Sequence, residues 1–110
     1  MNWHKLESLS DLEELTRDSY DTPKVLFKHS TRCSISSMAL SRMQPDIKSI
    51  DFYLLDIIAN RELSNQVAHR FNVLHQSPQL LIIFKGESRY DTSHLGISST
   101  VVDRQIGLLL

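Results

Sequence analysis

The segment KVLFKHSTRCSISSMALSRMQP, residues 24–45, decides the fold, because a strand pattern gives way to a helix pattern within it. Residues 24–30 are typical of a short strand with Val25 and Phe27 on one face. After that strand, apolar side chains recur at helical spacing until a proline ends the pattern: Ile35, Met38, Ala39 and Met43. This spacing predicts Met38 and Met43 as core residues. We therefore predict a strand that runs into a helix, with the chain's single cysteine, Cys33, at the junction.

A second strand and a second helix follow. The segment SIDFYLLDIIAN, residues 49–60, is apolar on both alternating faces, with Phe52 and Leu54 on one and Tyr53, Leu55 and Ile57 on the other. Such a strand belongs in a sheet that is covered on both sides, as parallel strands are. Asn60 is a plausible N-cap of the next helix, whose predicted buried stripe is Leu63, Val67, Ala68 and Phe71.

The last third of the chain predicts a hairpin and a helix. Residues 79–87, QLLIIFKGE, indicate a buried strand, and the glycine in its turn leads into a weaker strand, SRYDTSH, at residues 88–94. Residues 98–106, SSTVVDRQI, predict a short final helix. The remaining GLLL, residues 107–110, fits either a packed end or a frayed tail.

The N-terminal segment SDLEELTRDSY, residues 10–20, predicts a first helix, because Ser10 and Glu13 form a capping-box pair. Leucines recur at three-residue spacing in and before it: Leu6, Leu9, Leu12 and Leu15. After this helix the order is β-α-β and then α-β-β-α, which a thioredoxin-like α/β domain requires. We expect a central four-stranded mixed sheet flanked by helices, with Pro78 in the place where this fold has a cis proline opposite its thiol.

Length and composition narrow the class of protein. A chain of 110 residues predicts one domain, residues 1–110, with a core that needs no disulfide or metal. A formal net charge of −1 gives no general electrostatic reason to bind nucleic acid or an anionic membrane. The N-terminus has no signal-peptide pattern, and no apolar run approaches the ~20 residues of a membrane span. We expect a cytoplasmic protein, where an unpaired cysteine stays reduced.

Three segments together resemble the monothiol bacilliredoxins, small thioredoxin-like proteins whose signature is Thr-Cys-Pro-Ile-Ser. The segments are FKHSTRCSISSMAL (residues 27–40), ELSNQVAHRFNV (62–73) and HQSPQLLIIFKGE (75–87), and the likeness extends from Trp3 to about Val102. The sequence departs from the signature at two positions. Arg32 stands directly before the cysteine, and Ser34 replaces the family's proline and so keeps a backbone N–H.

The resemblance implies a specific reaction. Bacilliredoxins remove bacillithiol, a low-molecular-weight thiol, from proteins that carry it as a mixed disulfide, as part of the response to redox stress. Cys33 would be the attacking catalytic thiol, and Ser36 would occupy the slot of the resolving cysteine in dithiol relatives. Residues expected around the substrate are Arg32, Ser34, Ile35, Ser36, Ser77 and Pro78. Bacillithiol, or another small thiol, would be the co-substrate, and bacillithiolated client proteins the partners; the sequence leaves the oligomeric state open.

Individual side chains keep more than one interpretation. His29 is an acid/base candidate or, as we favour, a hydrogen-bonding strap for the loop, and His75 is expected at the surface. Arg32 is either a solvated cation or a ligand for the carboxylates of the bacillithiol malate group. The histidines and the cysteine show no zinc-binding spacing, so we expect no bound metal or cofactor.

Two further functions remain open from the sequence. A monothiol-glutaredoxin-like carrier would bind an iron–sulfur cluster between two subunits, although this chain lacks a glycine after the cysteine. A non-enzymatic thioredoxin-like adaptor would have an incidental thiol.

Overall fold

The fold is a mixed sheet between two layers of helices. The computed structural model describes residues 2–47 and 49–110. Its elements are, in chain order, β1 (Trp3–Lys5), α1 (Leu9–Asp18), β2 (Lys24–His29), α2 (Ser34–Ser41), β3 (Asp51–Asp56), α3 (Arg61–Phe71), β4 (Gln79–Phe84), β5 (Glu87–Ser93), the 3₁₀ helix η1 (His94–Gly96) and α4 (Ser99–Leu109). In the part of the chain so described, no helix is long and apolar enough to cross a membrane.

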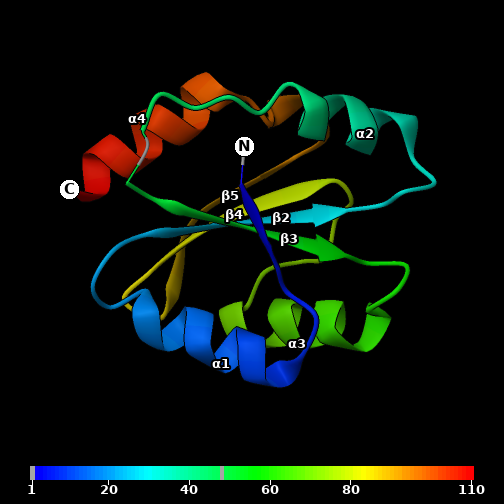
Figure 1. Cartoon of the computed structure of the whole chain (residues 1–110), viewed down its shortest axis with the longest axis horizontal. Helices are drawn as coiled ribbons and strands as arrows, with labels where there is room; N and C mark the ends of the chain where they lie inside the picture. Colours follow the sequence, from blue (N-terminus) through cyan, green and yellow to red (C-terminus); the bar gives the residue numbers. More distant parts are fainter. Residues whose placement is uncertain (1, 48) are drawn as a thin grey trace.

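The sheet has the strand order β1-β3-β2-β4-β5. Strands β1, β3 and β2 run parallel, whereas β4 is antiparallel to both β2 and β5. Helices α1 and α3 cover one face, and α2 and α4 cover the other (Figure 1). The predicted α/β order is confirmed, but the sheet has five strands instead of the four that the sequence predicted.

The additional strand is β1, which depends on tertiary contacts. Its three residues pair in parallel with β3, so that Trp3 is the Cα partner of Phe52. The Trp3 ring also packs edge-on against Phe27 and Phe52, with centroid distances of 6.0 and 5.7 Å. Three residues are too few to show a strand periodicity, and it is this packing that places them in the sheet.

Two apolar cores lie on opposite faces of the sheet. The core under α1 and α3 contains Leu12, Leu15, Leu26, Leu55, Val67 and Phe71. The core under α2 and α4 contains Val25, Phe27, Met43, Phe52, Val102 and Ile106. The predicted faces of β2 and β3 are therefore confirmed. The prediction of Met38 as a core residue is wrong: its side chain is 49% exposed, because α2 turns this position away from the sheet.

The ends of three helices can be compared with the predicted ends. Ser8, and not Ser10, is the N-cap of α1, and its Oγ accepts a hydrogen bond from the Asp11 N–H at 3.1 Å. Asn60 is the N-cap of α3 as predicted, but its side chain makes no capping hydrogen bond. Helix α4 continues to Leu109, so the final segment is helical up to that residue and not a frayed tail.

The β4–β5 hairpin turns in two residues, Lys85 and Gly86, which both have positive φ. Positive φ at both central positions is the property of the type I′ turns that suit the twist of a hairpin. The turn is also tied to the end of α1, because Ser19 O accepts from the Lys85 N–H at 2.9 Å and Ser19 Oγ accepts from the Gly86 N–H at 3.0 Å. The predicted hairpin is confirmed.

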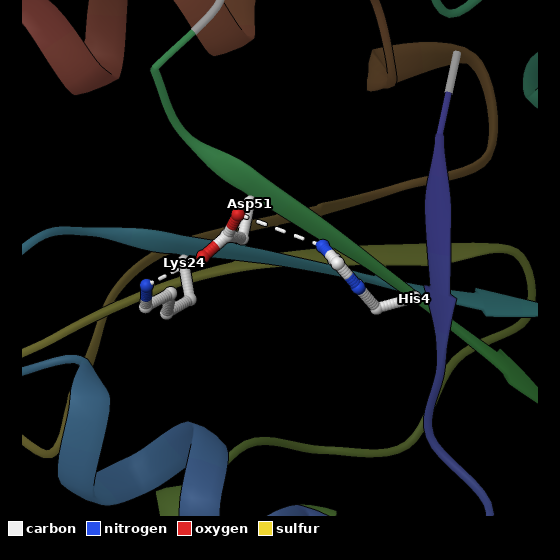
Figure 2. A network of polar contacts seen from close by, with 3 residues as sticks. All are labelled: His4, Lys24 and Asp51. Atoms are coloured by element: carbon white, nitrogen blue, oxygen red, sulfur yellow. Dashed lines mark hydrogen bonds and ion pairs between the residues drawn. The ribbon is translucent and has the colours of Figure 1, made fainter.

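A network of charged side chains joins the three parallel strands at one end (Figure 2). Lys24 Nζ donates to Asp51 Oδ2 at 2.9 Å, and His4 Nε2 lies 3.5 Å from Asp51 Oδ1. The Lys24 side chain is only 7% exposed, so Asp51 is the group that compensates a nearly buried cation. The hydrogen bond from Lys24, followed by its positive charge and that of His4, lowers the pKa of Asp51 below its usual value.

Replacing Asp51 should weaken the fold in a pH-dependent way. Asp51→Asn keeps the size of the side chain and removes the charge, and we expect a loss of about 1 kcal/mol at neutral pH because this carboxylate is 48% exposed. Since the folded-state pKa of Asp51 is lowered, its contribution is complete above the ordinary carboxyl range near ~4 and is lost as the pH falls below it. Urea unfolding at several pH values measures the difference. Asp91→Asn, at an exposed position, is the control, and equal losses in the two variants would contradict the prediction.

A second lysine of β2 is fully buried. Lys28 Nζ donates to Ser64 O at 3.2 Å and lies 3.3 Å from His75 Nδ1, so it connects β2 with α3 and with the loop before β4. Desolvation by burial lowers the pKa of Lys28 to about 8. A lysine with a lowered folded-state pKa binds its proton less readily than in the unfolded chain, so stability should rise as the pH passes from 8 towards 10.

Removing the Lys28 charge should abolish that rise. Compared with Lys28→Met, which has a similar volume, the wild type should gain roughly 2 kcal/mol of unfolding free energy between about pH 7 and 10. Chemical denaturation at intervals across this range gives the two curves. Lys5→Met changes an exposed lysine and should follow the wild type. Parallel curves for wild type and Lys28→Met would show that the buried amine does not titrate as described.

Candidate functional site

The junction between β2 and α2 places Cys33 at the start of a helix. Strand β2 ends at His29, and Cys33 is the N-cap of α2 with extended backbone angles, φ −114° and ψ 117°. The Cys33 N–H donates to Ser30 O at 3.2 Å, and Cys33 O accepts from the Ser37 N–H at 3.1 Å. The residue is half-buried and its thiol is free. Backbone hydrogen bonds on both sides therefore fix the cysteine at the end of the sheet and leave it partly open to solvent.

Ser36 holds this loop from inside. Its side chain is fully buried, and its Oγ accepts a hydrogen bond from the Ser30 N–H at 3.0 Å. The same Oγ lies 2.6 Å from His29 Nδ1. Burial lowers the pKa of His29, although the charge of Asp56 acts in the opposite direction. A neutral imidazole can accept a hydrogen bond from the Ser36 hydroxyl, so Ser30, Ser36 and His29 form one buried hydrogen-bonded chain. The interpretation of His29 as a strap for the loop is confirmed.

Pro78 lies at the same end of the sheet. The Ser77–Pro78 peptide bond is cis, as predicted. Lys28 and Gln79 are Cα partners in the antiparallel β2–β4 pair, so Pro78 precedes β4 beside the point where β2 leads towards Cys33. Pro78 O accepts from the His94 N–H at 3.1 Å, which ties η1 to the same edge.

The loop before Pro78 is held by polar groups whose contacts were not predicted from the sequence. Gln79 is fully buried, and its Nε2 donates to Leu74 O at 2.9 Å. His75 is exposed as predicted, but its Nδ1 contacts Lys28 and the hydroxyl of Ser64. Burial, followed by the charges of Lys28 and Arg61, lowers the pKa of His75. The one sequence feature that points to these groups is their position: Lys28 and Gln79 are polar residues directly next to continuous apolar runs.

The expected substrate-side residues separate into an exposed and a buried group. Arg32, Ser34 and Ile35 are exposed next to Cys33. Ser77 is half-buried and Pro78 is buried. The buried hydroxyl of Ser36 contacts His29 and Ser30, so this side chain supports the loop and is not open to a bound molecule.

This arrangement suits a reactive thiol. The side chain of an N-cap residue lies beside the first backbone N–H groups of its helix, and no side-chain hydrogen bond caps α2. The positive end of a helix stabilises a nearby anion by about 0.3–1 kcal/mol, and by up to ~2 kcal/mol in partly buried sites. A thiolate is the nucleophilic form of cysteine. The geometry therefore fits attack on a disulfide.

Comparison with solved structures identifies proteins of the same fold. Solved structures with the same fold include a protein assigned as an oxidoreductase with a thioredoxin fold, with a TM-score of 0.80 and 26% identity over 93% of this chain and 91% of that one. Thioredoxin from Trypanosoma brucei brucei matches with a TM-score of 0.76 and 12% identity over 98% of this chain and 90% of its own. Malassezia sympodialis thioredoxin, Mala s 13, matches with a TM-score of 0.75 and 13% identity over 97% of this chain and 90% of its own. The last two identities show a shared fold alone.

The family assignment comes from the sequence. Residues 4–102 match the family described as monothiol bacilliredoxin BrxC. The match covers nearly all of β1 to α4 and includes the β2–α2 junction with its single cysteine and the segment with the cis proline. The chain therefore belongs to the monothiol bacilliredoxin family, which makes it a thiol oxidoreductase with a thioredoxin fold.

Proposed function

We propose that this protein removes bacillithiol from client proteins that carry it as a mixed disulfide, with Cys33 as the catalytic thiol. The observation that carries the proposal is the position of the chain's one cysteine, half-buried at the N-cap of α2, in a member of the monothiol bacilliredoxin family. Because the chain has one thiol, the second exchange of the reaction needs a thiol from another molecule.

The reaction has two thiol–disulfide exchanges. The Cys33 thiolate attacks the bacillithiol sulfur of the mixed disulfide; the client sulfur leaves as a thiolate, and Cys33 carries bacillithiol in a new disulfide. A second small thiolate, such as free bacillithiol, then attacks that bacillithiol sulfur, forms a small disulfide and releases the Cys33 thiolate. Both steps benefit from stabilisation of the Cys33 thiolate, because a better-stabilised thiolate also leaves faster.

The second thiol must come from outside the chain. Ser36 stands three residues after Cys33, but an alcohol is not ionised at neutral pH, and this hydroxyl is buried against His29 and Ser30. Arg32 is exposed beside the thiol and is the cation best placed to meet a carboxylate of the bacillithiol malate group. The small thiol acts as a co-substrate in this scheme, and no bound cofactor is needed.

The first transfer can be observed directly. A client protein with a single bacillithiolated cysteine is mixed with the wild type, and intact-mass spectrometry follows both chains. We expect the wild type to gain one bacillithiol while the client loses it, and Cys33→Ala to gain none. A glutathionylated client tests the choice of small thiol and should react more slowly. An unchanged mass of the wild type, with a client that stays modified, would refute the proposal.

Converting the chain into a dithiol protein should change its cycle. Ser36→Cys places a second thiol in the resolving position, and we expect mild oxidation to reduce the count of free thiols from two to none, with no change in oligomer. Ser41→Cys is the matched control. This position lies on the same helix about 12 Å from Cys33 along the helix axis, beyond the ~7 Å limit between the Cα atoms of a disulfide, so both of its thiols should stay free. Two free thiols in oxidised Ser36→Cys would contradict the assigned geometry of the pair.

A further inference from the structure

A narrow groove runs along α2, away from the Cys33 end of that helix. Ile35 and Met38 of α2 form one wall, and Leu95 and Ile97 form the other. Its volume is about 120 Å³. Helix α2 and η1 pack against each other at this place, so the groove is a fixed part of the fold.

The walls of the groove expose large apolar side chains. Ile35 is 46% exposed, Met38 is 49% exposed and Leu95 is 93% exposed. Removing apolar surface from water is favourable, so three such side chains at one groove favour a partner that covers them. No other segment of the described residues covers Leu95.

The groove begins close to the thiol, because Ile35 in its wall stands two residues after Cys33. Cys33 is the N-cap of α2, and Met38 lies about 7.5 Å further along the helix axis at ~1.5 Å per residue. An extended peptide advances roughly 3.3 Å per residue. A polypeptide whose mixed disulfide approaches Cys33 would therefore bring a side chain two or three residues away over Met38.

The charge of the groove indicates which kind of partner residue would lie next to the side chain over Met38. Arg42 and His94 are among the lining residues, and none of the lining residues is Asp or Glu. Neither Arg42 nor Arg32 forms an ion pair within residues 2–47 and 49–110. An acidic residue of a partner would thus meet an unopposed guanidinium at Arg42.

The size of the groove separates a polypeptide from a small thiol. An engineered apolar cavity of about 150 Å³ binds benzene, so a groove of about 120 Å³ accepts one aliphatic side chain. Bacillithiol is a polar molecule with carboxylates, and an apolar wall offers it little. We propose that the α2–η1 groove, defined by Ile35, Met38, Leu95 and Ile97, binds an apolar side chain of the client, two or three residues from its modified cysteine, with an acidic residue next to Arg42. This inference rests on the proposed function.

The test uses peptides with one cysteine as a bacillithiol mixed disulfide. One peptide has Leu three residues from the cysteine and Asp beyond it, and a second has Ser in place of Leu. The ratio of their kcat/KM values measures how much the groove favours the Leu side chain. A change in thiol reactivity alters both values equally and leaves this ratio unchanged. We expect the wild type to prefer the Leu peptide by about tenfold. The double variant Met38→Ser, Leu95→Ser should bring the ratio close to one, and Leu108→Ser, which changes an exposed leucine outside the groove, should keep the wild-type ratio.

A charge exchange tests the acidic position. Arg42→Glu should lower kcat/KM for the Leu–Asp peptide and raise it for a Leu–Lys peptide. Equal kcat/KM values for the Leu and Ser peptides in the wild type, together with transfer from the small disulfide of bacillithiol, would overturn the groove while leaving the proposed function intact. A wild type that is inert with both peptides and with the small disulfide would overturn the proposed function, and the groove with it.

Discussion

The buried hydroxyl of Ser36 is the contact on which the thiol loop depends. It lies 2.6 Å from His29 Nδ1 and accepts from the Ser30 N–H at 3.0 Å, so the end of β2, the loop and the first turn of α2 meet at one oxygen. Without it, a buried N–H would lose its partner, which costs roughly 1–3 kcal/mol. The position that holds a resolving cysteine in dithiol relatives therefore has a structural role in this chain. The same contact positions the backbone that leads to Cys33.

The elements that the sequence predicts well are those whose pattern agrees with their packing. Residues 24–30 and 49–60 carry apolar side chains on both faces, and both became strands in the middle of a sheet that helices cover on each side. Strand β1 could not be predicted, because its three residues are ordered by pairing with β3 and by the rings of Phe27 and Phe52. The N-cap of α1 was misplaced by two residues, since two serines compete there and Asp11 favours Ser8 by accepting from the Glu7 N–H at 2.9 Å.

The candidate site was predictable in part. The position of Cys33 at the start of a helix and the cis bond before Pro78 both follow from the order of elements and the resemblance to a known family. The burial of Lys28 was not predicted, because a polar residue next to an apolar run can equally face solvent, and it is the contacts with α3 and the loop of His75 that bury it. Met38 shows the reverse: its helical spacing suggests a core residue, whereas α2 turns this side chain away from the sheet and leaves it 49% exposed.

A chain with a single thiol has a constraint that a dithiol protein lacks. Under the proposed mechanism the disulfide on Cys33 is resolved from solution, so the site must admit first a client and then a second thiol. A covered thiol would block the second step, whereas a fully exposed one would lose the stabilisation of the helix end. The half-buried N-cap meets both needs. The apolar side chains of Ile35, Met38 and Leu95 are exposed on α2 and η1, and under the proposed scheme a bound client would cover them.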